Sequence, residues 1–151
     1  MIDLILAQME SEHLEAIAAL EQECFTQPWS YKSLEEELDN DTAHFFVALS
    51  EGEVVGYIGV FVVADSCYIS NVAVSPRCRR QGVGRALLKM AILTADAMGT
   101  DFISLEVRYT NYAAICLYRS LGFEEMGVRR NFYRHPTEDA LIMTKLFQRK
   151  D

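Results

Sequence analysis

The amino-acid sequence predicts an α/β domain built around a mixed central sheet, and two observations carry this prediction. Short β-branched and aromatic runs, which favour strands, are interspersed with segments whose apolar residues recur at helical spacing. No repeat, low-complexity segment or flexible linker interrupts the 151 residues, a length that can bury one substantial core. We therefore expect a single domain spanning residues 1–151, with the element order β-α-α-β-β-β-α-β-α-β-β.

The first part of the chain is expected to form a strand, two helices and two further strands. The run IDLILAQ is typical of an opening strand. Ser11 is placed to cap a helix that continues to Phe25, and Ser30 is placed to cap a second, acidic helix that ends at Leu38. The runs HFFVALS and VVGYIGVFVV then predict two strands separated by the turn-like EGE.

The second part of the chain is expected to form a crossover and a closing hairpin. The strand CYISNVAV ends before Ser75-Pro76, because proline disfavours continuation of a central strand. A long helix over residues 83–98 follows, and Gly99 can end it. It leads to the strand DFISLEV through a crossover that should be parallel and right-handed. Thr110 or Asn111 then caps a shorter helix. FEEMGV and DALIMTKLF are the closing strands, joined by a loop containing RRNFYRHPTE.

Charge and cysteine content exclude several classes of protein. The formal net charge is −8; residues 1–53 hold thirteen acidic residues and one basic residue, and the remainder is net positive. A general nucleic-acid binder is usually basic overall, so we expect no direct nucleic-acid contact. The four cysteines form no C-x-x-C pair, which predicts reduced thiols and no zinc site. No apolar run reaches the roughly 20 residues that span a bilayer, and the N-terminus does not resemble a signal peptide. We therefore expect a soluble, cytoplasmic protein.

Residues 77–89, RCRRQGVGRALLK, gather five basic side chains around two glycines directly before the long helix. Three interpretations compete: a nucleic-acid patch, a phosphate cradle at a helix start, or an ordinary solvated helix end. Glycine lets backbone N–H groups face a ligand, and a helix N-terminus favours anions. Arginine is unfavourable at that end of a helix unless a ligand supplies negative charge. The Walker pattern is absent, and the dinucleotide pattern fails because Leu87 replaces its third glycine.

The segment that begins at Arg79, R-R-Q-G-V-G, resembles the acetyl-CoA signature of the GNAT N-acetyltransferases, in which loop amides hold the pyrophosphate of coenzyme A. The resemblance covers nearly the whole chain, including its element order. RimI-type members of the family contain segments similar to QPWS, NVAVSPRCRRQGVGRALL, LEVRYTNYAAICLYRSLGF and RRNFYRHPTEDALIM. These enzymes acetylate the α-amino group of the N-terminal alanine of a small-subunit ribosomal protein. The resemblance implies that acetyl-CoA is the cosubstrate and that no metal is needed. It also implies cofactor contacts from Val72, Ala73, Val74, Arg79, Arg80, Gln81, Gly82, Val83, Gly84, Arg85, Asn111 and Tyr118.

Two side chains are candidates for proton transfer. Strand alternation places Glu106 on the same face as Phe102 and Ser104, where it is either a solvent-facing charge or a poorly solvated base. Tyr118 lies seven residues after Asn111, on nearly the same helix face, and a helix tyrosine is commonly a core aromatic. The family resemblance implies that Glu106 is the general base and that Tyr118 protonates the leaving sulfur.

The acceptor side is less well defined by the sequence. The resemblance places Trp29 and Tyr133 in loops around the incoming peptide, although both could instead seal the core beneath those loops. It also implies that the strand ending at Val74 diverges from DFISLEV and so opens a slot for the cofactor arm. Two alternatives remain: a GNAT enzyme for a small-molecule amine, or an acetyl-CoA-binding module without transfer activity.

Overall fold

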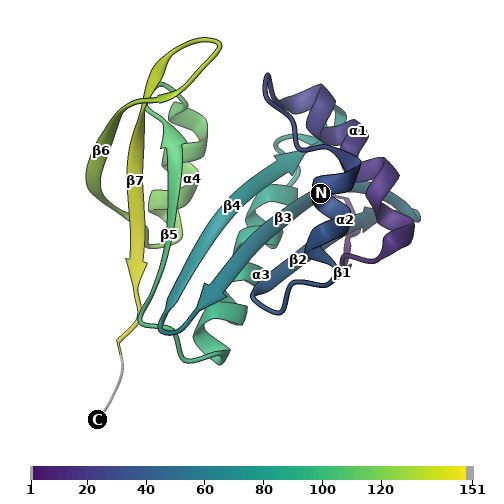
Figure 1. Cartoon of the computed structure of the whole chain (residues 1–151), viewed down its shortest axis with the longest axis horizontal. Coiled ribbons are helices and arrows are strands. Elements are labelled where there is room, and N and C mark those ends of the chain that lie inside the picture. The colour runs from purple at the N-terminus through teal and green to yellow at the C-terminus, as the bar shows by residue number, and fades with distance from the viewer. Residues whose placement is uncertain (1, 149–151) are drawn as a thin grey trace.

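The computed structural model describes residues 2–148, and within them seven strands form one mixed sheet in the order β1-β2-β3-β4-β5-β7-β6. The expected α/β class and element order are confirmed (Figure 1). The remaining residues of the predicted 1–151 domain lie outside the described part. The strands are β1 (Ile5–Gln8), β2 (Ala43–Ser50), β3 (Glu53–Val63), β4 (Ser66–Val74), β5 (Phe102–Arg108), β6 (Glu124–Tyr133) and β7 (Glu138–Leu146). The helices are α1 (Leu14–Cys24), α2 (Tyr31–Glu37), α3 (Val83–Ala97) and α4 (Tyr112–Ser120), with 3₁₀ turns at Ser11–His13 and Pro76–Cys78.

The helices cover both faces of the sheet, as an α/β architecture requires. On one face, α1 and α2 bury Leu14, Ile17 and Leu34 against β2 and β3. On the other face, α3 and α4 bury a larger cluster against β2 to β5 and β7. None of the helices within residues 2–148 has the length and apolar character that a membrane crossing needs.

Local sequence signals account for most element ends. Ser30 caps α2, because its Oγ accepts a hydrogen bond from the Ser33 N–H at 3.1 Å. Asn111 caps α4 in the same way, accepting from the Ala114 N–H at 3.3 Å. The expected cap at Ser11 is wrong: Ser11 is the first residue of a 3₁₀ turn that precedes α1, and its N-cap is Glu10. A 3₁₀ turn satisfies the helix start here without a serine side chain.

The strands β4 and β5 pair only where they begin. Their parallel ladder, within the described residues, consists of three pairs, from Ser66 with Phe102 to Tyr68 with Ser104. Directly after it, a β-bulge leaves Ser70 as an extra residue in β4, and its Oγ donates to the Gly59 carbonyl at 3.1 Å. A bulge bends its strand and increases the local twist. Figure 1 shows β4 and β5 side by side at the lower end and diverging toward the top, so the expected divergence is present.

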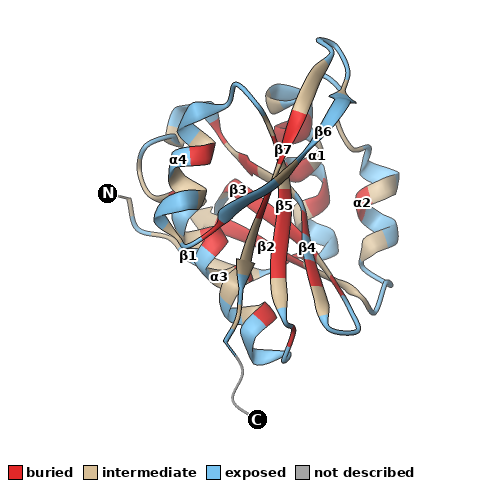
Figure 2. Ribbon diagram, turned by 90° about the vertical axis from the view of Figure 1, so that its left-hand side faces the viewer, coloured by how far each residue is buried: buried red, intermediate tan, exposed pale blue. Residues whose placement is uncertain are grey.

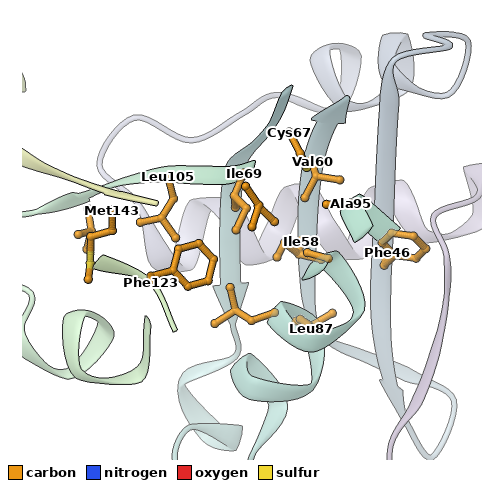
Figure 3. Packing of buried hydrophobic residues seen from close by; sticks show 14 of the residues in the cluster. Phe46, Ile58, Val60, Cys67, Ile69, Leu87, Ala95, Leu105, Phe123 and Met143 are labelled. Carbon is orange, nitrogen blue, oxygen red and sulfur yellow. The ribbon is translucent and has the colours of Figure 1, made fainter. Parts of the chain in front are cut away.

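Phe123, the residue between α4 and β6, fills the core below this opening. Figure 3 shows its ring between Leu105 and Met143 on one side and Ile58 and Ile69 on the other. A buried aromatic ring covers a large apolar area and can bridge strands that no longer share a ladder. The two halves of the sheet therefore remain one packed unit although their hydrogen bonding stops early.

The closing hairpin is longer than the sequence predicts. β6 continues to Tyr133 and β7 starts at Glu138, so most of the segment expected as a loop is strand. The sequence of β6, EEMGVRRNFY, has no regular alternation of polar and apolar residues, because β6 is an edge strand exposed along most of its length (Figure 2). Tyr133 is accordingly the last residue of a strand and not a loop residue.

Candidate active site

A cavity of about 470 Å³ lies in the opening between β4 and β5. Its walls come from the end of α1 and the segment after it, the bulged part of β4, the second half of β5, and α4. Such a volume is in the range of small-molecule and cofactor sites. Among its lining residues are the predicted Trp29, Val72, Glu106, Asn111, Tyr118 and Tyr133. The structure thus brings candidates for catalysis, cofactor binding and acceptor binding into one site.

Tyr118 reaches this cavity from α4 as a partly buried side chain. Its ring packs against Phe123, with the ring centroids 5.9 Å apart. Burial raises the pKa of Tyr118 to about 12, because the phenolate would lose its hydration. The hydroxyl therefore stays protonated at neutral pH and is available as a proton donor.

Glu106 enters the cavity from β5, and the expected strand alternation is confirmed. Leu105 and Val107 point into the core on the α3 side, while Glu106 has 31% of its side chain exposed. Its Oε1 lies 3.5 Å from Nε of Arg129 on β6. The carboxylate is thus partly solvated and has a cation beside it, which lies between the two expected cases of a solvent-facing charge and a poorly solvated base.

The turn between β6 and β7 is held over the cavity by a polar network around Arg108. The Arg108 guanidinium donates to the carbonyls of Arg134 and Pro136 at 3.1 and 3.0 Å, and to Glu138 Oε1 at 3.3 Å. Glu138 Oε2 accepts from the Thr110 N–H at 2.7 Å. The hydroxyl of Thr110, with Arg108 beside it, lowers the pKa of Glu138, so this carboxylate stays charged.

Tyr133 is fixed by the same network. The Arg108 guanidinium lies over its ring, 4.6 Å from the centroid, in a cation–π contact. Burial, with the nearby charge of Glu106, raises the pKa of Tyr133 to about 12. A rigid neutral tyrosine at the mouth of the cavity suits contact with an acceptor.

The glycine stretch forms the start of α3 and lies outside the cavity lining. Gly82 is the N-cap, with φ of 84°, and Arg80 has φ of 63°. The first N–H groups of α3 have no partner inside the helix, and left-handed residues beside such N–H groups favour a concave backbone that binds anions. Gln81 bonds the carbonyl of Arg77, and Arg85 bonds Ser120 on α4. The loop therefore has the geometry of an anion site.

Two other residues that the sequence predicts as cofactor contacts have side chains buried in the core. Ala73 and Val83 are buried in opposite cores, so their side chains cannot meet a ligand. The Val74 carbonyl accepts from Arg79 Nε at 3.4 Å and from the Cys24 thiol at 3.5 Å. Arg79 thus folds across the end of β4. Gly84 lies in the first turn of α3.

The sequence reasoning missed several site residues. It did not identify Glu21 in the cavity wall, Asn71 beside it, or the Arg108–Glu138 pair. One signal was available: Glu21 continues the apolar helical stripe of Leu14 and Ile17, where an acid is unexpected. Within residues 2–148, no group of three or more His, Cys, Asp or Glu side chains is arranged to hold a metal ion.

Comparison with known proteins places this architecture in a family. The family model of the GNAT acetyltransferases matches residues 14–123. The chain therefore belongs to the GNAT acetyltransferase family and is an enzyme that uses acetyl-CoA. The strand divergence, the cavity and the left-handed loop at α3 fit a long ligand that carries phosphates at one end.

Two relatives are similar over most of their length. The [Ribosomal protein bS18]-alanine N-acetyltransferase of Escherichia coli (strain K12) is 38% identical over 142 residues, covering 91% of this chain and 94% of the relative. The N-alpha-acetyltransferase RimI of Mycobacterium tuberculosis is 34% identical over 134 residues, covering 85% of this chain and 83% of the relative.

A solved structure is similar over nearly the whole chain. The crystal structure of the ribosomal-protein-S18-alanine N-acetyltransferase from Escherichia coli superposes with a TM-score of 0.91 at 34% sequence identity. The match covers 99% of this chain and 97% of that chain. The resemblance to RimI-type members that the sequence motifs suggested is thus confirmed.

The loop geometry at Gly82 leads to a test of the cofactor site. We expect Gly82→Ala to raise the KM for acetyl-CoA by about tenfold, the effect of losing one hydrogen bond to a charged group. A Cβ is strained at a φ of 84°, so the loop must turn its N–H groups away.

Gly99 is the matched control, because it follows the other end of α3 with φ of 76° and has open space around its missing Cβ. Gly99→Ala should lower the melting temperature to a similar extent and leave the KM for acetyl-CoA unchanged. Equal KM values in both variants and the wild type would contradict the assignment of the loop.

Proposed function

We propose that the protein transfers the acetyl group of acetyl-CoA to the N-terminal α-amino group of a protein, and that the acceptor is the N-terminal alanine of a small-subunit ribosomal protein. One observation carries the proposal: Glu106, Tyr118 and Tyr133 all line the cavity between β4 and β5. The names of the similar relatives support the choice of acceptor. An enzyme that modifies a ribosomal protein acts in the cytoplasm, and the described residues 2–148 form one catalytic domain.

The chemistry requires a group that accepts a proton from the ammonium and a group that donates one to the leaving sulfur. When bound, acetyl-CoA supplies the acetyl group as a thioester whose sulfur leaves as a thiolate. Glu106 takes a proton from the α-ammonium group, directly or through water, so that the neutral amine can attack the thioester carbonyl. Tyr118 donates its proton to the leaving sulfur as the carbon–sulfur bond breaks. The attacking nitrogen loses its second N–H proton as the amide forms, and this proton restores the Tyr118 hydroxyl. The products are an acetylated amine and a free thiol, and the proton taken by Glu106 is released to solvent.

The residues that hold the cofactor are those of the α3 start and the end of β4. The backbone of Val72–Val74 contacts the cofactor arm, and the N–H groups of Gly82–Arg85 bind the pyrophosphate. Arg79 and Arg80 add positive charge, and Asn111 contacts the cofactor from the start of α4. Trp29 and Tyr133 lie on opposite sides of the acceptor mouth.

Intact-mass analysis of acceptors after incubation with acetyl-CoA tests the proposal. We expect a peptide with a free N-terminal alanine to gain one acetyl group. The same peptide with a blocked N-terminus and a free lysine should gain none, because the lysine amine, with a pKa of about 10.4, is mostly charged at neutral pH.

Two further assays, acetylation of small amines and binding of acetyl-CoA, test the alternatives to the proposed function. Acetylation of a polyamine or an aminoglycoside, with no peptide product, would indicate a small-molecule enzyme. Binding of acetyl-CoA without product on any acceptor would indicate a module without transfer activity. Either outcome would overturn the proposal.

A further inference from the structure

Glu21 is a buried carboxylate that the proposed proton transfers do not use. It lies near the end of α1, and its residue has no exposed surface. Leu14 and Ile17, two turns and one turn earlier, fill the core between α1 and the sheet. A leucine would pack at position 21 without a charge to bury, whereas burying a carboxylate costs several kcal/mol. The charge therefore needs an explanation other than packing.

Three chain segments converge on this carboxylate. Glu21 Oε1 accepts a hydrogen bond from the backbone N–H of Trp29 at 2.8 Å. Its Oε2 accepts from the Tyr57 hydroxyl on β3 at 2.7 Å and from Asn71 Nδ2 on β4 at 3.2 Å. Asn71 Nδ2 also lies 3.1 Å from the Tyr57 hydroxyl. A single side chain thus ties the segment after α1 to two neighbouring strands.

These donors are all neutral, so the charge of Glu21 is offset by hydrogen bonds and not by a cation. Burial raises the pKa of Glu21, against the opposing effect of the bonds from Trp29, Tyr57 and Asn71. A carboxylate that accepts several bonds in a dry site holds its donors firmly, because hydrogen bonds to charged groups are the stronger ones.

The residues that Glu21 fixes form one wall of the cavity. Trp29 and Asn71 line it, and Asn71 directly follows the bulged Ser70 that begins the divergence of β4 from β5. The Trp29 ring packs on Phe45, with centroids 5.9 Å apart, so the Glu21 bond and this ring contact together set the position of Trp29. The opposite wall is Tyr133, held by Arg108.

We propose that Glu21 is a positioning residue for the acceptor: its buried carboxylate fixes Trp29 and Asn71 as one wall of the acceptor mouth. This inference rests on the proposed function, because it assumes that the amine enters between Trp29 and Tyr133. It assigns Glu21 no contact with the reacting atoms. Its effect therefore falls on the KM for the acceptor and not on the KM for acetyl-CoA.

Glutamine at position 21 should disturb this wall without emptying the core. Its oxygen can accept from Trp29, but its NH₂ group then faces the Tyr57 hydroxyl and the Asn71 amide, which must both reorient. We expect Glu21→Gln to raise the KM for the N-terminal peptide by about tenfold, the effect of one lost bond to a charged group, with the KM for acetyl-CoA within about twofold of wild type.

Trp29 is the one tryptophan of the sequence, so its fluorescence reports directly on the wall. In Glu21→Gln, quenching of this emission by acrylamide should increase relative to wild type. Glu23→Gln is the matched control, since Glu23 is exposed on the same helix and its substitution removes the same charge. Both the peptide KM and the quenching of Glu23→Gln should equal those of wild type.

Tyr57→Phe gives a second, independent variant that keeps the core ring and removes one donor to Glu21. It should raise the peptide KM in the same direction and by a smaller factor. A purely structural role would lower the melting temperature of these variants while leaving the peptide KM and Trp29 quenching at wild-type values, and that result would overturn the inference.

Failure of the proposed function gives a different pattern. The wild-type enzyme would then fail to acetylate the peptide at all, whereas Trp29 quenching would still compare Glu21→Gln with wild type. Unchanged quenching would overturn the role of Glu21 in fixing Trp29, and increased quenching would support it whatever the acceptor is.

Discussion

Replacing Tyr118 by phenylalanine is expected to lower kcat for acetyl transfer by about 10²-fold or more at neutral pH, the contribution of a general acid. The phenyl ring keeps the contact with Phe123, whose centroid lies 5.9 Å from that of Tyr118, so the fold should not change. Only the proton donor is lost. The KM for acetyl-CoA should stay within about twofold of wild type, because the variant keeps the shape of the cavity.

The pKa of Tyr118 sets the pH behaviour expected for the wild-type enzyme. With a pKa of about 12, the phenol is protonated below that pH. Its own titration should therefore cause no loss of kcat between about pH 6 and about pH 10. A fall in kcat across that range that persists unchanged in Tyr118→Phe would have another origin.

Steady-state release of coenzyme A thiol measures both constants for this variant. Tyr112→Phe is the matched control, since Tyr112 starts the same helix, is 69% exposed and lies outside the cavity lining. It should retain wild-type kcat. A normal kcat in Tyr118→Phe would remove Tyr118 from the proton-transfer scheme.

Elements defined by local signals were predictable from the sequence. α3 combines a regular apolar stripe with glycines near both ends, and Ser30 caps α2 through its own hydroxyl. The divergence of β4 from β5 was expected only through family resemblance. Its physical basis is the bulge at Ser70 and the packing of Phe123, both of which depend on residues distant in sequence.

The site residues likewise fall into those that local motifs predict and those that depend on contacts between distant segments. Glu106 and Tyr118 were found because they belong to contiguous motifs, and the structure brings both to one cavity. Glu21 was not found, because a single acid in an amphipathic helix gains meaning only from Tyr57 and Asn71 on separate strands. The role of Arg108 on β5 was not predictable for the same reason, because it depends on Glu138 on the neighbouring strand β7.

The two walls of the acceptor mouth share one construction principle. In each wall a carboxylate on a regular element holds a neighbouring segment. Glu21 on α1 binds Trp29, and Glu138 on β7 binds Arg108, which in turn binds the carbonyls of the turn that follows Tyr133. Regular elements place side chains more accurately than loops do. Both the segment after α1 and the β6–β7 turn therefore have defined positions beside the proposed acceptor site.

Replacing Glu106 by glutamine is expected to lower kcat by about 10²-fold at neutral pH, the contribution of a general base. An α-amino group has a pKa of about 7.7–8.0, so its neutral fraction rises from roughly one-tenth at about pH 7 to roughly nine-tenths at about pH 9. The deficit of the variant should therefore shrink by up to about tenfold across this range, because solvent then removes the proton that Glu106 takes in the wild type. The ratio of wild-type to variant kcat, measured at each pH, tests this directly.

Arg129→Gln separates the base from its ion pair. The Glu106–Arg129 contact of 3.5 Å is lost in both variants, but only Glu106→Gln loses the carboxylate. A partly exposed ion pair contributes at most about 1 kcal/mol to stability, so both variants should remain folded. Arg129→Gln should retain kcat within a few-fold of wild type. If the two variants lose kcat equally, the ion pair matters and Glu106 is not the base. A deficit of Glu106→Gln that stays constant with pH would likewise contradict the role of Glu106 as the general base.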